Sequence, residues 1–250
     1  MEKTDINSDL YKIRHSLAHV LAQAVLEIRP DAKLGFGPPI DSGFYYDFDL
    51  TEPLSTEDLP MLEKRMRQII KKGQVFEREE LGHDEMVERL DKDNQGYKIE
   101  QVEDLSAQNE ILSLYRNGPF WDLCEGPHVD STRDIPKNCF SLDSLAGAYW
   151  KGSEENNMMQ RVYGLAFETG DELKEFKEKR QLAMERDHRK LNIKQHYVFE
   201  HVYGHVEKTY KKYKYEFEKR LICIEDLISI LHSTMPMPAV RWVHTLGKKL

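Results

Sequence analysis

The chain has 250 residues, 40% of them apolar and 32% charged, and its formal net charge is −8. That length allows one large domain with a sizeable buried core, alone or with an appendage. No apolar run approaches the ~18 residues of a membrane helix, and the polar, acidic residues 1–15 are unlike a signal peptide. Three cysteines are too few for a disulfide scaffold. We therefore expect a cytoplasmic protein without membrane association, and the acidic charge argues against a simple non-specific nucleic-acid binder.

The first half of the chain predicts helices on either side of a region of short strands. Ser8 or Asp9 can cap a helix whose apolar residues recur at helical spacing until Pro30. The following stretch is rich in glycine and proline around an aromatic run, which is typical of short strands joined by a tight turn. In chain order, we expect a helix from residue 9, short strands within 35–48, a helix from 55 to 72, a strand over 75–79 and a short helix over 83–90.

Beyond Gly96 the pattern is strand-like, with glycine and proline between the segments. The predicted strands are 97–102, 113–115, 120–123, 140–142, 148–150 and 158–166. A long charged helix over 171–191 follows. This order predicts an α+β fold with a mostly antiparallel sheet packed with helices, because helices and parallel strands do not alternate regularly.

The last part of the chain differs in composition. Five of the twelve tyrosines lie between Tyr197 and Tyr215, interleaved with lysines, on a helical apolar stripe. This pattern fits a nucleic-acid surface, but an amphipathic helix packed on the body is the favoured interpretation. We therefore predict a main domain over 1–170, a linker helix over 171–191 and a helical extension over 192–250.

Two pairs of residues are candidates for chemistry. His15 and His19 stand four residues apart on the first helix, so both imidazoles project from one face. Cys124 and His128 have the same spacing, but glycine and proline between them exclude a regular helix and predict a loop after a strand. Loops held by a rigid sheet are common places for functional residues.

Three imidazoles and one thiol leave several kinds of site open. They could form a tetrahedral zinc site, or they could activate water without a metal. A papain-like nucleophilic cysteine ranks last, because nothing local supplies its orienting group. A second histidine pair, His201 and His205, has no cysteine partner and is interpreted as solvent-exposed.

Several blocks of sequence resemble the editing domain of bacterial threonyl-tRNA synthetase, over about residues 8–191. The blocks are 14–21 (RHSLAHVL), 37–47 (GPPIDSGFYYD), 122–129 (DLCEGPHV), 146–152 (AGAYWKG) and 159–164 (MQRVYG), and 186–191 (RDHRKL) is similar to the linker before the family's catalytic domain. The two histidine-containing motifs are also shared with alanyl-tRNA editing proteins. After Leu191 nothing resembles the synthetase's ATP-binding motifs or anticodon-binding domain, so we expect no amino-acid activation from this chain alone.

The resemblance implies an editing reaction. A synthetic site distinguishes serine from threonine poorly, since a missing methyl is worth only ~1–3 kcal/mol. A second site would then hydrolyse the ester of Ser-tRNA(Thr) and spare Thr-tRNA(Thr). The expected partner is the acceptor end of tRNA(Thr), with a threonyl-tRNA synthetase and a second copy of the chain as further candidates. No cofactor is expected to be required, and zinc is the alternative.

Position by position, the resemblance also assigns the site. It gives site roles to His15, His19, Lys98, Asp122, Cys124 and His128, and a contact with the terminal adenosine to Tyr46. Lys98 and His128 are expected to carry the water and proton chemistry, and Asp122 to hold the seryl amine. Two rival functions remain: a non-catalytic accessory protein that binds tRNA or the synthetase, and a zinc-dependent editing protein of the alanyl type with His15, His19, Cys124 and His128 as ligands.

Overall fold

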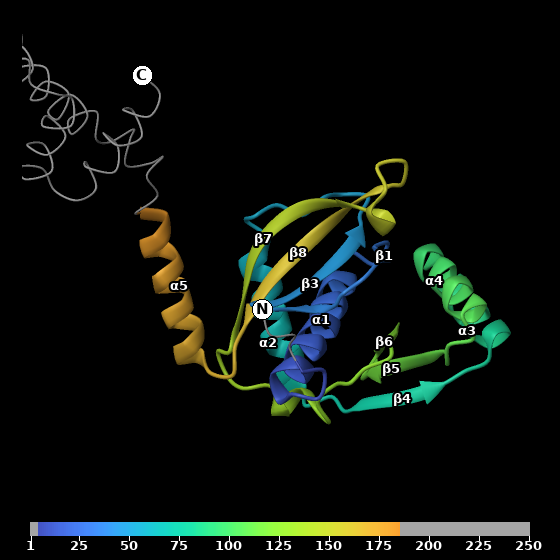
Figure 1. The fold of residues 1–250 in the computed structure, drawn as a ribbon, viewed down its shortest axis with the longest axis horizontal. Helices are drawn as coiled ribbons and strands as arrows, with labels where there is room; N and C mark the ends of the chain where they lie inside the picture. Colours follow the sequence, from blue (N-terminus) through green and yellow to red (C-terminus); the bar gives the residue numbers. More distant parts are fainter. Residues whose placement is uncertain (1–4, 186–250) are drawn as a thin grey trace, which may run out of the picture. The chain divides into compact units, whose positions relative to one another are not determined.

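The computed structural model describes residues 5–185 (Figure 1). The chain divides into two units, Met1–Arg180 and Gln181–Leu250, and the elements that follow belong to the first, except that the last helix extends five residues into the second. The predicted extension over 192–250 and the second histidine pair lie outside the described residues, and the predicted domain limits stay predictions. Among the described helices, none combines the length and apolar character that a membrane span requires.

A five-stranded antiparallel sheet forms the larger layer of the unit. Its strand order is β1-β3-β8-β7, with β2 paired to β3 as well. The strands are β1 (Lys33–Leu34), β2 (Pro39–Ile40), β3 (Gly43–Asp49), β7 (Phe140–Tyr149) and β8 (Met158–Ala166). Phe44, Tyr46 and Phe48 alternate along β3 and are all buried, because successive side chains of a strand point to opposite faces. The aromatic run therefore supplies the centre of the core.

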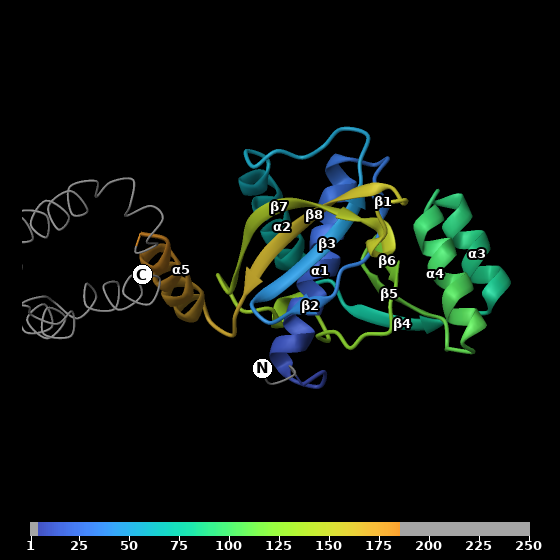
Figure 2. The same ribbon diagram turned by 45° about the horizontal axis from the view of Figure 1, so that its top comes forward.

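Two helices, α1 (Asp9–Ile28) and α2 (Leu59–Lys72), pack against this sheet and against each other (Figures 1 and 2). The Ser8 hydroxyl caps α1 by accepting a hydrogen bond from the Tyr11 amide at 3.2 Å. α2 ends at Gly73, whose φ of 67° is left-handed and favours glycine. The start of α1 and the end of α2 agree with the prediction, whereas α2 begins at Leu59 and not at residue 55. α1 is buried along most of its length.

A second layer is smaller. Its antiparallel sheet has the order β4-β5-β6, and two helices that contact each other, α3 and α4, lie beside it (Figure 2). The elements are β4 (Phe76–Glu80), β5 (Ser113–Asn117), β6 (Phe120–Leu123), α3 (His83–Lys92) and α4 (Gly96–Ala107). The helix α4 also contacts β1, which joins the two layers.

The predicted α+β class with antiparallel sheets is confirmed, but three of the predicted strands differ from the structure. Residues 97–102 form part of α4, so the predicted strand is wrong. Polar and apolar residues alternate there over a few positions, yet the buried side chains Lys98 and Val102 are four residues apart, which is a helical spacing. The separate strands 140–142 and 148–150 are one strand, β7. Residues 143–148 of this strand are partly buried or exposed and mostly small or polar, so they lack a regular apolar pattern. The predicted long charged helix is α5 (Gly170–Glu185).

Candidate functional site

The helix α1 brings its histidines to the second, smaller sheet. His15 and His19 lie one turn apart on the same face, with ring centroids 5.5 Å apart. His19 is only 2% exposed, whereas His15 is half-buried. The helical spacing thus places both rings where β6 ends.

Cys124 and His128 lie on the loop that follows β6, as expected. The Cys124 amide donates to the Ser113 carbonyl at 3.0 Å, and the Ser113 hydroxyl donates to the Cys124 carbonyl at 2.8 Å. Gly126 has a φ of 81°, and a Cβ at this position would lie 2.5 Å from the Tyr115 hydroxyl. A glycine is therefore required for this loop to pass so close to β5.

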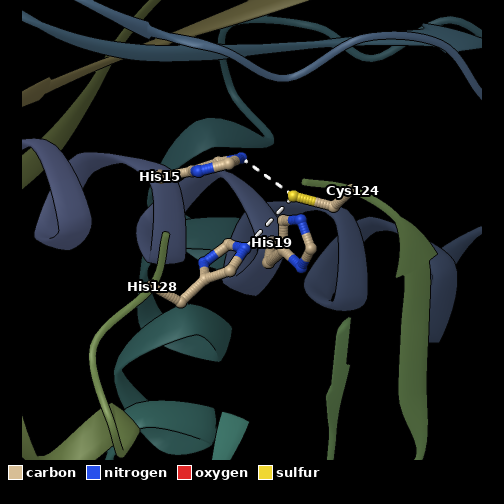
Figure 3. Close-up of side chains that lie close together, drawn as sticks. All are labelled: His15, His19, Cys124 and His128. Atoms are coloured by element: carbon tan, nitrogen blue, oxygen red, sulfur yellow. Dashed lines mark hydrogen bonds between the residues drawn. The ribbon is translucent and has the colours of Figure 1, made fainter. Parts of the chain in front are cut away.

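The four side chains converge, and Figure 3 shows them pointing toward one another. One ligand atom from each of His15, His19, Cys124 and His128 lies within 4.8 Å of the others. Cys124 Sγ is 3.2 Å from His15 Nε2 and 3.3 Å from His128 Nε2. Residues more than 100 positions apart therefore form one cluster, and their roles in a reaction remain predictions.

A buried ion pair lies beside this cluster. The Lys98 ammonium is 2.8 Å from Asp122 Oδ1, and both side chains are less than 5% exposed. The Tyr46 hydroxyl donates a hydrogen bond to Asp122 Oδ2, and His19 Nε2 is 4.0 Å from the same oxygen. Gly37 packs directly on the Tyr46 ring, where a Cβ would lie 2.1 Å from a ring carbon. All residues that the sequence assigned to the site are thus neighbours.

The way in which Lys98 reaches the site was not visible in the sequence. The side-chain amide of Gln95, just before α4, accepts from the Leu34 amide at 2.7 Å and donates to the Ala32 carbonyl at 3.1 Å. The Lys98 amide in turn donates to the Gln95 carbonyl at 3.0 Å. Gln95 therefore fixes the first turn of α4, which carries Lys98, to the larger layer.

Burial sets the charge state of the cluster. It lowers the pKa of His15 to about 4, although the hydrogen bond to the Pro127 carbonyl acts in the opposite direction. Burial also lowers the pKa of His19 and of His128 well below the ordinary value, with neighbouring histidines adding to the effect. The pKa of the Cys124 thiol is raised to about 12, again mainly by burial. Neutral imidazoles and a protonated thiol disfavour the papain-like interpretation, which requires a thiolate.

The tautomer of His15 follows from its partners. Its Nδ1 lies 3.2 Å from the Pro127 carbonyl, an oxygen that can only accept. A neutral His15 must therefore carry its proton on Nδ1 and present the unprotonated Nε2 to Cys124. In this structure that nitrogen faces the Cys124 thiol, and its lone pair is the one that could take up a proton or bind a metal.

The residues also fit a zinc ion. Imidazole and thiolate are its common ligands, with bonds of ~2.0–2.3 Å, so the ligand atoms of a tetrahedral site are roughly 3.3–3.6 Å apart. The separations of 3.2 and 3.3 Å from Cys124 Sγ are close to these values, and His15 Nδ1 already makes the carbonyl bond usual for a metal ligand. A zinc ion held there would supply a Lewis acid, but four protein ligands fill the tetrahedron and leave no position for a catalytic water.

Several residues of the site went unnoticed in the sequence. Phe76 stacks on the His128 ring with centroids 4.8 Å apart and nearly parallel planes, and Tyr115 lies 4.5 Å from it. Ser16 lies 3.1 Å from His128 Nδ1. Ser16 lies between the two α1 histidines in the sequence, and this position was the available hint of a role in the site. A single serine in a buried helix has no distinctive spacing, so its contact with His128 could not be predicted.

Comparison with known proteins identifies the relatives of this site. The family model "Threonyl and Alanyl tRNA synthetase second additional domain" matches residues 112–163, which include Asp122, Cys124 and His128. The chain is 47% identical over 182 residues to a threonine–tRNA ligase of Gloeobacter violaceus, covering 73% of this chain and 29% of that protein. It is 50% identical over 184 residues to one of Dehalococcoides mccartyi, covering 74% and 31%. The chain is homologous to part of threonyl-tRNA synthetase.

A further threonine–tRNA ligase, from Acetivibrio thermocellus, is 46% identical over 178 residues, covering 71% of this chain and 28% of that protein. The chain thus spans about 30% of the length of these threonyl-tRNA synthetases. The match agrees with the editing-domain resemblance in the sequence, and the described fold is that of a module related to a tRNA synthetase.

Proposed function

We propose that this threonyl-tRNA synthetase-type module hydrolyses the ester of Ser-tRNA(Thr) and spares Thr-tRNA(Thr). The observation that carries the proposal is the cluster of His15, Cys124 and His128 beside the buried Lys98–Asp122 pair. The homology to threonyl-tRNA synthetases supports the substrate class. The partner in this reaction is the acceptor end of tRNA(Thr).

The reaction requires one proton to be taken up and one to be delivered. The oxygen of a water molecule attacks the ester carbonyl and loses a proton, and the bond to the ribose oxygen then breaks as that oxygen gains a proton. In the proposed mechanism, the bound ester opens the two hydrogen bonds of Cys124, so that His15 Nε2 accepts the water proton and His128 Nε2–H donates a hydrogen bond to the ribose oxygen. In the free chain Cys124 is hydrogen-bonded to both imidazoles, and in the reaction the proton that His15 has taken up passes to the ribose oxygen as the ester bond breaks.

Lys98 supplies positive charge close to the developing oxyanion. A buried ammonium acts strongly there, because the surroundings screen charge less than water does. Asp122 forms the ion pair with Lys98, and the Tyr46 hydroxyl donates a hydrogen bond to Asp122. Together these two contacts hold the Lys98 ammonium in place. Burial raises the pKa of Tyr46 well above its ordinary value, so the hydroxyl stays protonated and can donate. In the bound complex, we further propose that Asp122 contacts the seryl amine and Tyr46 the terminal adenosine.

The test is deacylation by the purified chain with Ser-tRNA(Thr) and Thr-tRNA(Thr) as separate substrates. We expect loss of serine only, and a decrease of ~10²-fold or more in His128→Ala and Lys98→Ala. The matched controls His83→Ala and Lys92→Ala change exposed side chains on α3 and should keep the wild-type rate. Wild-type turnover in both site variants would refute the assigned roles.

Two further outcomes separate the rival functions. Intact tRNA binding without turnover would favour the non-catalytic accessory protein and overturn the proposal. Turnover that is lost after chelation and restored by Zn²⁺, with alanyl-tRNA editing substrates preferred, would favour the zinc-dependent alternative, which the spacing of the four ligand atoms supports. The proposed reaction is expected to survive chelation.

A further inference from the structure

Ser16 connects α1 to the loop that carries His128. Its side chain is fully buried, and its hydroxyl oxygen lies 3.1 Å from His128 Nδ1. The same oxygen accepts a hydrogen bond from the Val129 amide at 3.1 Å. Ser16 therefore binds the His128 ring and the backbone immediately after it.

The direction of each hydrogen bond follows from the donors and acceptors available. His15 Nδ1 donates to a carbonyl, so its unprotonated Nε2 must accept the one proton of the Cys124 thiol. The thiol sulfur can then only accept from His128, so His128 carries its proton on Nε2. His128 Nδ1 is left without a proton and must accept from the Ser16 hydroxyl.

The bonds thus form a single chain with one direction. The Val129 amide donates to Ser16, Ser16 donates to His128 Nδ1, and His128 Nε2 donates to Cys124. Loss of the donor or acceptor at either end of this series would reverse or break the hydrogen bonds in between. The Val129 amide occupies one acceptor position on Ser16, which helps to orient the hydroxyl proton toward the imidazole.

We propose that Ser16 is a positioning residue that fixes the orientation of the His128 ring and, together with Cys124, holds its proton on Nε2. The role in catalysis rests on the proposed deacylation, but the tautomer does not. In the reaction, this tautomer makes His128 the donor to the leaving oxygen and His15 the acceptor. Alanine at position 16 would leave the Val129 amide and His128 Nδ1 without their buried partner.

Nitrogen-15 NMR of the metal-free wild-type chain tests the tautomer directly. Long-range proton–nitrogen spectra distinguish an imidazole protonated on Nε2 from one protonated on Nδ1. We expect Nε2–H for His128 and Nδ1–H for His15, the latter as an internal reference. A wild-type His128 with its proton on Nδ1 would overturn the proposal whether or not the chain is a deacylase.

The variant Ser16→Ala separates positioning from simple packing. Because sulfur is a weak acceptor, Cys124 alone should not hold the proton on Nε2. We therefore expect a mixture of His128 tautomers, an unchanged His15, and a decrease in kcat of about tenfold with little change in KM. Ser16→Thr, which keeps the hydroxyl, should restore the Nε2–H tautomer. The control Ser106→Ala removes a buried hydroxyl on α4 that has no hydrogen-bond partner among the described residues, and should leave both spectra and rate unchanged. A wild-type His128 spectrum in Ser16→Ala would contradict the proposal.

Discussion

The two antiparallel sheets of the described unit rest on apolar cores of very different size. The core shared by α1, α2 and the five-stranded sheet contains 25 buried apolar residues, whereas the core between α3, α4 and the three-stranded sheet contains six. His15 and His19 come from the larger layer, and Lys98, Asp122 and Cys124 come from the smaller one. The chemistry therefore depends on how firmly the weaker layer is held against the stronger one.

Truncation of one buried leucine in each core should give the largest losses of stability. Leu17 and Leu114 are both completely buried, one in each core, and each change to alanine is expected to cost ~2–5 kcal/mol. In Leu114→Ala, hydrogen exchange should increase in β5, α3 and α4 before α1 is affected, because a small core supports an independently opening unit.

Leu17→Ala should instead increase exchange in both layers, since the smaller layer docks on α1 and β1. Ile111→Ala, at a position that is 63% exposed, is the control and should change stability by less than ~0.5 kcal/mol. Equal loss of protection in α1 and β5 in Leu114→Ala would contradict this prediction and show that the two layers open together as one unit.

The strength of sequence inference also differs between the layers. In the larger layer, cap residues, helical apolar spacing and the alternating aromatics of β3 each indicated the correct element, because these signals are local. In the smaller layer, residues 97–102 alternate like a strand but form a helix, since burial of Lys98 and Val102 depends on a distant sheet.

The candidate site shows the same contrast between local sequence signals and distant contacts. The spacing of His15 with His19 and of Cys124 with His128 was visible in the sequence, and it indicated each pair separately. Lys98 came only from the family resemblance. Ser16 was missed, because its partner is 112 positions away and no local pattern marks a contact of that kind.

Low pH should destabilise the domain because it favours protonation of the site histidines. The loss of stability should be somewhat smaller than that caused by truncating a core leucine. His15 has a folded-state pKa of about 4, below its ordinary value of 6.5. The unfolded chain therefore binds more protons between these values, and stability is lost as the pH falls from 6.5 toward 4. For His15 alone the loss is about 3 kcal/mol at pH 4.

Urea unfolding of the wild type and of His15→Gln from pH 7.5 to 4.5, with a chelator present, measures this effect. The difference in unfolding free energy between the two proteins should narrow or change sign as the pH falls. The exposed His83 in α3 provides the contrast. Its pKa is raised, chiefly by the hydrogen bond to Asp84, so any stability that it contributes is present below pH 6.5 and disappears above the raised pKa. A pH-independent difference between wild type and His15→Gln would contradict the buried, neutral state of His15.

Removing the contact that Gln95 makes between the two layers should cause the smallest loss of stability but a larger loss of activity. Gln95→Ala removes the side chain that pairs with the Leu34 amide and the Ala32 carbonyl, which is expected to cost ~1–3 kcal/mol. Because Gln95 precedes Lys98 by one helical turn, α4 should shift and the deacylation rate should fall by more than the fraction of unfolded protein explains. Gln108→Ala, at the exposed far end of the same helix, is the matched control. Loss of stability in Gln95→Ala together with deacylation at the wild-type rate per folded molecule would show that Lys98 reaches the site without the Gln95 contact. The smaller layer would then be positioned by its other links to the larger sheet, such as the hydrogen bond between Tyr97 and Asp49.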